Sequence, residues 1–177
     1  WSAPVVATTP QPAPQPQPQP QPASGAIDLS HEGNGAFTFG EAGDQQLRYQ
    51  TFTANANASI SKVEVKVRRW FDASDMTVSL YATSGNKPVG ESLATATVSA
   101  STIPEAFAVV SAPLAYSGLT NGATYAIVLG QVEPSFFSYE WQTADVSAPL
   151  KFGKYSGGEW IDESMIGDGW LKVYVGP

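Results

Sequence analysis

The sequence predicts an all-β domain, an antiparallel β-sandwich of jelly-roll-like form, that follows a disordered linker rich in proline and glutamine. Three observations carry this prediction. Apolar residues alternate with polar ones over short runs, and turn residues separate those runs. The first 26 residues hold eight of the fourteen prolines and no charged residue. Short alternating runs between turns are typical of antiparallel sheets.

The linker is predicted over residues 1–26. Residues 10–22 alternate proline with small or polar residues. Each proline fixes φ and lacks a backbone donor, so neither a helix nor a sheet ladder can form there. The favoured interpretation is a semi-rigid spacer of about 3 Å per residue, and the alternative is a ligand for a proline-binding groove. A spacer implies covalently linked domains of a larger protein, with one folded module over residues 27–177.

The strands of this module are predicted from alternation. Val63, Val65 and Val67 alternate with Glu64 and Lys66, as in a strand with one buried and one solvated face. Residues 81–88 contain Gly, Asn and Pro, which together predict a turn. Further strands are predicted at residues 36–39, 48–52, 78–80, 93–98, 107–111, 124–129, 136–142, 150–155 and 170–175.

Composition excludes several classes of function. The net charge is −7 and the nine Lys and Arg residues are scattered, which disfavours a nucleic-acid or anionic-membrane partner. No apolar run approaches the ~18 residues of a membrane span. The chain has no cysteine, which excludes disulfides, thiolate metal sites and a cysteine nucleophile.

Several core and turn segments resemble those of a known group of domains. The segments are residues 49–53, 60–65, 78–83, 93–98, 119–129 and 171–175. They resemble bacterial extracellular β-sandwich domains of the choice-of-anchor type, and are similar to jelly-roll carbohydrate-binding modules. The resemblance implies a secreted or cell-surface location in a bacterium and no shared catalytic residues. Because fold similarity alone does not fix a function, the ligand must be argued from side chains.

Two functions are expected from this reading. The first is a non-catalytic carbohydrate-binding module that tethers a larger secreted or surface protein to polysaccharide or a cell-surface glycan. The alternative is a structural or adhesive surface domain with no sugar ligand. A contiguous patch of exposed aromatic side chains flanked by polar groups would favour the first.

An enzyme is not expected. His31, the only histidine, lies in a polar segment beside the linker, whereas a catalytic triad needs a histidine in a cleft. The neighbouring carboxylates Asp72 and Asp75, like Glu159 and Asp162, fit solvated turns. Glycoside hydrolysis instead needs two carboxyl groups that face each other across a cleft.

One structural calcium is a candidate cofactor, because jelly-roll binding modules frequently carry one and calcium prefers several oxygen ligands from loops. The candidate ligands are Asp28, Glu32, Asp44 and Asp168, although no calcium-loop motif is present.

Aromatic residues are the candidate sugar-binding side chains, because a sugar ring stacks its C–H groups on an aromatic face. Trp170 and Tyr174 alternate with the apolar set of the last strand and are expected to face solvent. Trp160 and Tyr155 are expected nearby, with Trp160 covering a sheet edge. The same alternation places Phe136, Ser138, Glu140 and Gln142 opposite a core face formed by Phe137, Tyr139 and Trp141. Trp141 can reach a rim at the strand end, and Trp70 is interpreted as a cap on the core. For each tryptophan, a core position is the competing interpretation.

Overall fold

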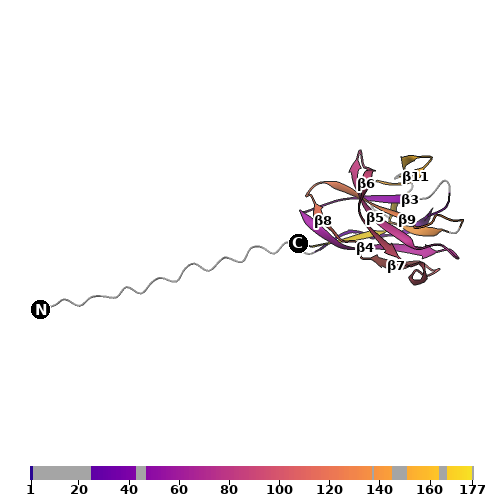
Figure 1. Ribbon diagram of the computed structural model, residues 1–177, viewed down its shortest axis with the longest axis horizontal. Helices are drawn as coiled ribbons and strands as arrows, with labels where there is room; N and C mark the ends of the chain where they lie inside the picture. The colour runs from indigo at the N-terminus through magenta and orange to yellow at the C-terminus, as the bar shows by residue number, and fades with distance from the viewer. Residues whose placement is uncertain (2–24, 43–46, 137, 145–150, 164–166, 177) are drawn as a thin grey trace.

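The predicted β-sandwich is confirmed by the computed structural model of the chain. It describes residue 1 and residues 25–42, 47–136, 138–144, 151–163 and 167–176. Within those residues the fold consists of two antiparallel sheets packed face to face (Figure 1). The linker predicted for residues 1–26 lies mostly outside the described residues.

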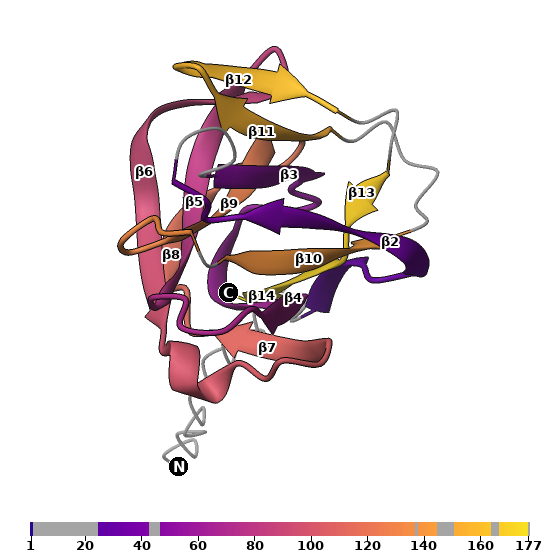
Figure 2. The same cartoon turned by 90° about the vertical axis from the view of Figure 1, so that its right-hand side faces the viewer.

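The first sheet has eight strands. Its main path runs β1-β14-β4-β10-β13, with β2 paired to β10 and with β7 and β8 paired to β4. Figure 2 shows β2 and β10 side by side in this sheet. The strands are β1 (Gly25–Leu29), β2 (Glu32–Phe39), β4 (Ala58–Arg69), β7 (Ala108–Ala112), β8 (Tyr116–Leu119), β10 (Tyr139–Ala144), β13 (Asp168–Gly169) and β14 (Leu171–Gly176).

The second sheet has six strands in the order β12-β11-β3-β9-β5-β6. A short 3₁₀ helix, Ala100–Thr102, leads from its last edge strand to β7 of the first sheet. The strands are β3 (Leu47–Thr53), β5 (Met76–Ser84), β6 (Lys87–Val98), β9 (Thr124–Gln131), β11 (Phe152–Ser156) and β12 (Glu159–Asp162).

The core lies between the two sheets and is built by alternation. Val63, Val65 and Val67 of β4 are fully buried, while Glu64 and Lys66 between them face outward, as the sequence predicts. Large aromatic side chains fill the same space from both sheets. The fully buried ones in this cluster are Phe39, Phe52, Tyr139, Trp141 and Phe152.

The turn predicted over residues 81–88 is much shorter in the structure. Gly85 and Asn86 alone make it, with φ of 58° and 63°. Two consecutive residues with positive φ form the tight hairpin turn whose twist matches that of the flanking strands. Strand β6 therefore begins at Lys87 and includes Pro88. A proline is tolerated there because β6 is an edge strand and one side of it needs no backbone donor.

The folded domain begins earlier than residue 27. Gly25 and Ala26 belong to β1, where they pair with Val175 and Tyr174 of β14. The sequence placed both in the linker because small residues after a proline tract carry no strand signal. The ladder with β14 is what makes them part of the sheet.

Candidate functional site

Two of the predicted sugar-binding residues are buried, which corrects the prediction for them. Trp141 is fully buried in the core, and its indole Nε1 donates to the Trp170 carbonyl at 2.8 Å. Trp170 is only 5 % exposed. It does lie outside the main core cluster, with Lys172 Nζ 5.6 Å from its ring centroid. Alternation thus gives its side of the strand correctly, but the ring is covered and offers no face to a ligand.

Tyr174 lies on the outer face of the first sheet, as predicted, but within a set of charged side chains. Its hydroxyl donates to Glu64 Oε2 at 2.7 Å, and Lys62 Nζ sits 3.9 Å from its ring centroid. The hydrogen bond to Glu64, together with desolvation, raises the pKa of Tyr174. The ring face is therefore occupied by an ammonium group.

Tyr155 and Trp160 do come together, but on the outer face of the opposite sheet. Their ring centroids are 5.0 Å apart in an edge-to-face arrangement. Trp160 also packs edge-on over Tyr49, whose ring is fully buried beneath it. Burial raises the pKa of Tyr49 to about 12, and nearby Asp162 adds to the shift. These rings cover the middle of the sheet and contact one another edge to face, so they do not form a flat platform.

The candidate calcium ligands do not converge in the described part of the chain. Asp28 binds Ser30 and Lys172, and Glu32 binds Lys66. Asp168 is buried beside Gln50, and Asp44 lies outside the described residues. Among the described residues no group of three His, Cys, Asp or Glu side chains is placed to hold a metal ion. The structural calcium stays a prediction.

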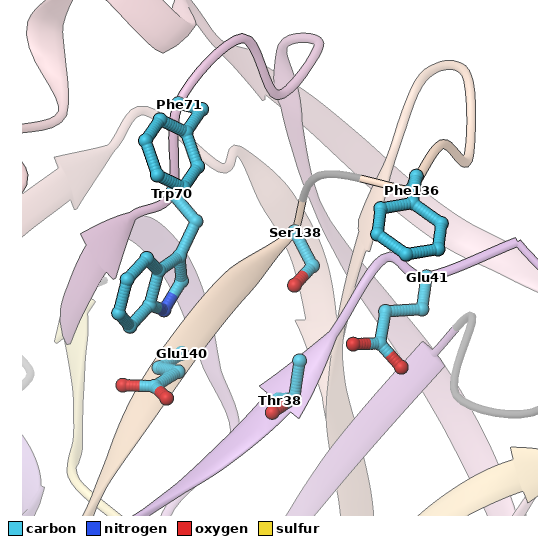
Figure 3. A pocket seen from close by; sticks show the side chains of 7 residues that line it. All are labelled: Thr38, Glu41, Trp70, Phe71, Phe136, Ser138 and Glu140. Atoms are coloured by element: carbon cyan, nitrogen blue, oxygen red, sulfur yellow. The ribbon is translucent and has the colours of Figure 1, made fainter.

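A different group of aromatic side chains is exposed. Trp70, Phe71 and Phe136 are 39 %, 61 % and 93 % exposed. They line a hollow at one end of the first sheet, here called the aromatic hollow. Figure 3 shows Trp70 and Glu140 along one side and Phe136 and Glu41 along the other, with Ser138 and Thr38 between them. The lining residues are Thr38, Glu41, Trp70, Phe71, Phe136, Ser138 and Glu140.

The strands place these residues by simple alternation. Thr38 of β2 pairs with Glu140 of β10, and Glu140 pairs in turn with Arg68 of β4. All three are outward positions, because Phe39, Tyr139 and Val67 beside them are buried. Trp70 follows two residues after Arg68 and lies on the same side. Its backbone amide donates to the Ser138 carbonyl at 2.9 Å, which fixes the end of β4 to the segment before β10.

The segment that carries Trp70 and Phe71 is held in a strained conformation. Phe71 has φ of 45°, a region that large side chains avoid. Such a residue persists where surrounding contacts over-determine it, often at a ligand-binding site. Here an Arg69 guanidinium N–H donates to the Phe71 carbonyl, and Arg69 Nε donates to the Ile103 carbonyl at 3.2 Å. The Tyr139 hydroxyl donates to the Ser74 carbonyl at 2.6 Å.

Buried polar groups support the hollow from below. The Gln131 side chain accepts a hydrogen bond from the Ser74 amide at 2.9 Å and donates one to the Gly40 carbonyl at 2.8 Å. These two bonds connect the segments on either side of the hollow. Gly40 has φ of 89°, and a Cβ there would lie 2.4 Å from the Gln131 side chain, so this position requires glycine. Arg48 Nε donates to the Thr38 carbonyl at 2.9 Å. Burial lowers the pKa of Arg48, and its ion pair with Glu163 opposes that shift.

One ion pair borders the hollow. Arg68 contacts Glu140 at 2.6 Å, and its guanidinium carbon lies 4.7 Å from the Trp70 ring centroid. The guanidinium thus orients both a carboxylate and an indole ring. The hollow has a volume of about 290 Å³, at the lower end of the range for small-ligand pockets. Aromatic walls and a polar floor of this size can stack one ring and bind its hydroxyl groups.

The aromatic hollow was not predicted from the sequence. Alternation placed Phe136, Ser138, Glu140 and Gln142 on the outward face, and the structure confirms this, since all four line hollows on that face. Phe137, predicted on the core face, lies outside the described residues. Trp70 was interpreted as a cap on the core, which is wrong because its side chain is exposed. Two adjacent large aromatic residues at a strand end, Trp70 and Phe71, were the available signal, since neighbours along a strand cannot both face the core.

The fold and the hollow define an antiparallel β-sandwich with an exposed aromatic site at one end of a sheet. No protein-family model matches the chain, and no curated protein matches it in sequence. The described residues contain no helix long and apolar enough to cross a membrane.

Proposed function

We propose that this domain is a non-catalytic carbohydrate-binding module whose binding site is the aromatic hollow. The observation that carries the proposal is the cluster of Trp70, Phe71 and Phe136, exposed and flanked by carboxylates and hydroxyls. The rings can stack on the C–H face of a sugar, and Glu41 and Glu140 can accept hydrogen bonds from its hydroxyl groups. Exposed apolar patches rimmed by polar groups commonly mark binding sites.

The rigidity of the hollow supports the same proposal. Ligand binding is weakened when loops and side chains must become ordered at the moment of binding. The segment from Arg69 to Ser74 is already fixed by hydrogen bonds to Ser138, Ile103, Gln131 and Tyr139. A site held in this way loses little conformational entropy when a sugar binds.

The resemblance to jelly-roll carbohydrate-binding modules points to the same class and to its setting. In this proposal the domain is secreted or displayed on a bacterial surface, and it tethers a larger protein to polysaccharide. The proline-rich segment that precedes the domain would separate it from the rest of that larger protein. Such anchoring requires no catalytic activity from the domain itself.

The experiment is a binding measurement on the whole chain with two variants in the hollow. Affinity electrophoresis in gels containing neutral polysaccharides, followed by calorimetry on any that retard the protein, would compare the parent with Trp70→Ala. Removal of the stacking ring is expected to cost about 1–3 kcal/mol of binding free energy, by analogy with bases stacked on aromatic side chains.

Phe71→Gly is the second variant, and it separates binding from folding. Glycine relieves the ~1–2 kcal/mol cost of a left-handed conformation but adds ~0.5–1 kcal/mol of backbone entropy, so stability should change little. Sugar binding should nevertheless fall. Tyr155→Ala, in the aromatic cluster of the opposite sheet, is the control and should bind like the parent.

The alternative function is a structural or adhesive surface domain without a sugar ligand. It predicts that the parent binds none of the polysaccharides and that the hollow variants change nothing. Loss of binding in Tyr155→Ala but not in Trp70→Ala would move the site to the opposite sheet and overturn the assignment of the hollow.

A further inference from the structure

The aromatic hollow is one end of a longer depression on the first sheet. Beyond Glu140 lies a second hollow, lined by Arg68, Phe107, Glu140, Gln142 and residues 33–36. Glu140 lines both hollows. The two together are here called the trough.

The trough follows β10 and is longer than one sugar ring. Its outward side chains run from Ser138, just before that strand, through Glu140 to Gln142, about 13 Å at the usual rise per residue. In the other direction, Glu41 and Phe136 also line a further hollow with Ala42 and Ser135. The aromatic hollow therefore has lined space on both sides of it. A chain that passes through fits this shape better than a chain end that stops there.

A small side chain lies on the floor of the trough. On β2 the outward residue opposite Gln142 is Ala36, which is exposed. Its small side chain leaves space between β4 and the edge of β2. A larger residue at this position would fill the trough without touching the core, because the inward neighbours Phe37 and Trp141 lie on the other face of the sheet.

Two ion pairs lie beside the trough, and Glu41 adds a further carboxylate at its aromatic end. Arg68 contacts Glu140 at 2.6 Å, and Lys66 contacts Glu32 at 2.8 Å. Gln142 Nε2 donates to Glu32 Oε2 at 3.0 Å, which links the second pair to β10. An anionic ligand would have to displace a carboxylate from each of these cations and would be repelled by Glu41. Hydroxyl groups both donate and accept, so a neutral sugar can bind an ion pair without breaking it.

Resting on the proposed function, we infer that the trough binds the interior of an extended, uncharged polysaccharide. One ring lies in the aromatic hollow against Trp70, and the next lies over the Arg68–Glu140 pair toward Gln142 and Ala36. The affinity comes from stacking in the first position and from hydrogen bonds in the second. Uronic-acid or sulfated chains are poor ligands because no unpaired cation of the trough is available to their charge.

The test varies ligand length, ligand charge and the floor of the trough. The probes are cello-, malto-, manno- and xylo-oligosaccharides from one unit to several, with oligogalacturonate as the anionic probe. For the neutral series that binds, affinity should rise by about tenfold or more between one unit and several, the equivalent of one further bound ring. Added salt should change this affinity little, since few counterions are released.

The variant is Ala36→Ile, which keeps a residue favourable to a strand and fills the floor. It should remove the gain with length and leave binding of the shortest ligand unchanged. Thr97→Ile, at an exposed position of β6 in the other sheet, is the matched control and should bind like the parent.

The outcomes separate this inference from the function on which it depends. If no neutral saccharide binds the parent, the proposed function fails. If binding requires Trp70 but does not change with length or with Ala36→Ile, the function stands and the extended trough is wrong. Tighter binding of oligogalacturonate, weakened steeply by salt, would overturn the choice of an uncharged chain.

Discussion

At the scale of single residues, Trp70 and Trp170 show how burial rather than residue type decides a role. Trp70 comes just after an alternating run and Trp170 begins one, and Trp70 is 39 % exposed whereas Trp170 is only 5 % exposed. Trp170→Ala is therefore expected to lower the free energy of unfolding by ~3–5 kcal/mol, as for other buried aromatic side chains, although the ring lies outside the main core cluster. Trp70→Ala should cost about 1 kcal/mol or less. Urea denaturation of both variants measures the difference, and equal midpoints would contradict it.

Asp168 is the residue for which pH dependence is expected. Its side chain is buried, and Oδ1 has no hydrogen-bond partner among the described residues. Burial raises its pKa above the 3.8 of an exposed aspartate, although a hydrogen bond from Gln50 opposes this. Ionisation therefore destabilises the folded state. The penalty is absent below pH 3.8 and grows as the pH rises through the raised folded-state pKa.

Asp168→Asn is accordingly expected to stabilise the domain at neutral pH by roughly 1 kcal/mol, a typical effect of one buried polar group. Below the ordinary pKa of aspartate the gain should vanish. Thermal denaturation over a pH series, with calcium and with chelator, measures both. If the variant is instead less stable than the parent only when calcium is present, Asp168 is a metal ligand and the predicted calcium site gains direct support.

At the scale of elements, β1 is the first strand in the described part of the chain, and it begins before residue 27. Its ladder with β14 runs from Gly25↔Val175 to Leu29↔Leu171. A chain that begins at Gly25 is expected to melt like the full chain. One that begins at Ile27 loses two paired residues and should melt lower, by about 2–4 °C for each kcal/mol of stability lost. Calorimetry on the two truncations decides between the boundaries, and identical melting temperatures would show that Gly25 and Ala26 add nothing.

At the scale of the whole molecule, the absence of catalysis remains a prediction. Glu41 and Glu140 line the same hollow, and paired carboxylates are what glycoside hydrolysis uses. However, Glu140 accepts a hydrogen bond from Arg68, and the hollow is open enough to leave Phe136 93 % exposed. Catalytic sites usually exclude water. We expect no release of reducing ends from any polysaccharide that binds. Turnover that is abolished by Glu41→Gln or Glu140→Gln would contradict this.

The class of fold followed from local pattern alone. Alternation in residues 63–67 and 136–142 predicted which side chains face the core, and Val63, Val65, Val67, Tyr139 and Trp141 are buried there. The pattern is reliable because the side-chain period of a strand is two and one face must be dry. The short strand β12 was not predicted, and neither was β1, because both depend on a neighbouring strand more than on their own residues.

The candidate site depended on tertiary structure. Alternation states which face of a strand a side chain takes, but it does not state what else covers that face. Trp170 points away from the core as the sequence indicates and is still buried, whereas Trp70, at the end of β4, is left exposed. The aromatic hollow combines side chains from three distant segments, which become neighbours only when β2, β10 and β4 pair. They are Thr38 and Glu41, Trp70 and Phe71, and Phe136, Ser138 and Glu140. The sequence by itself therefore determined the sandwich and the faces of its strands. Only the packing of distant segments decided which aromatic rings remain open to a ligand.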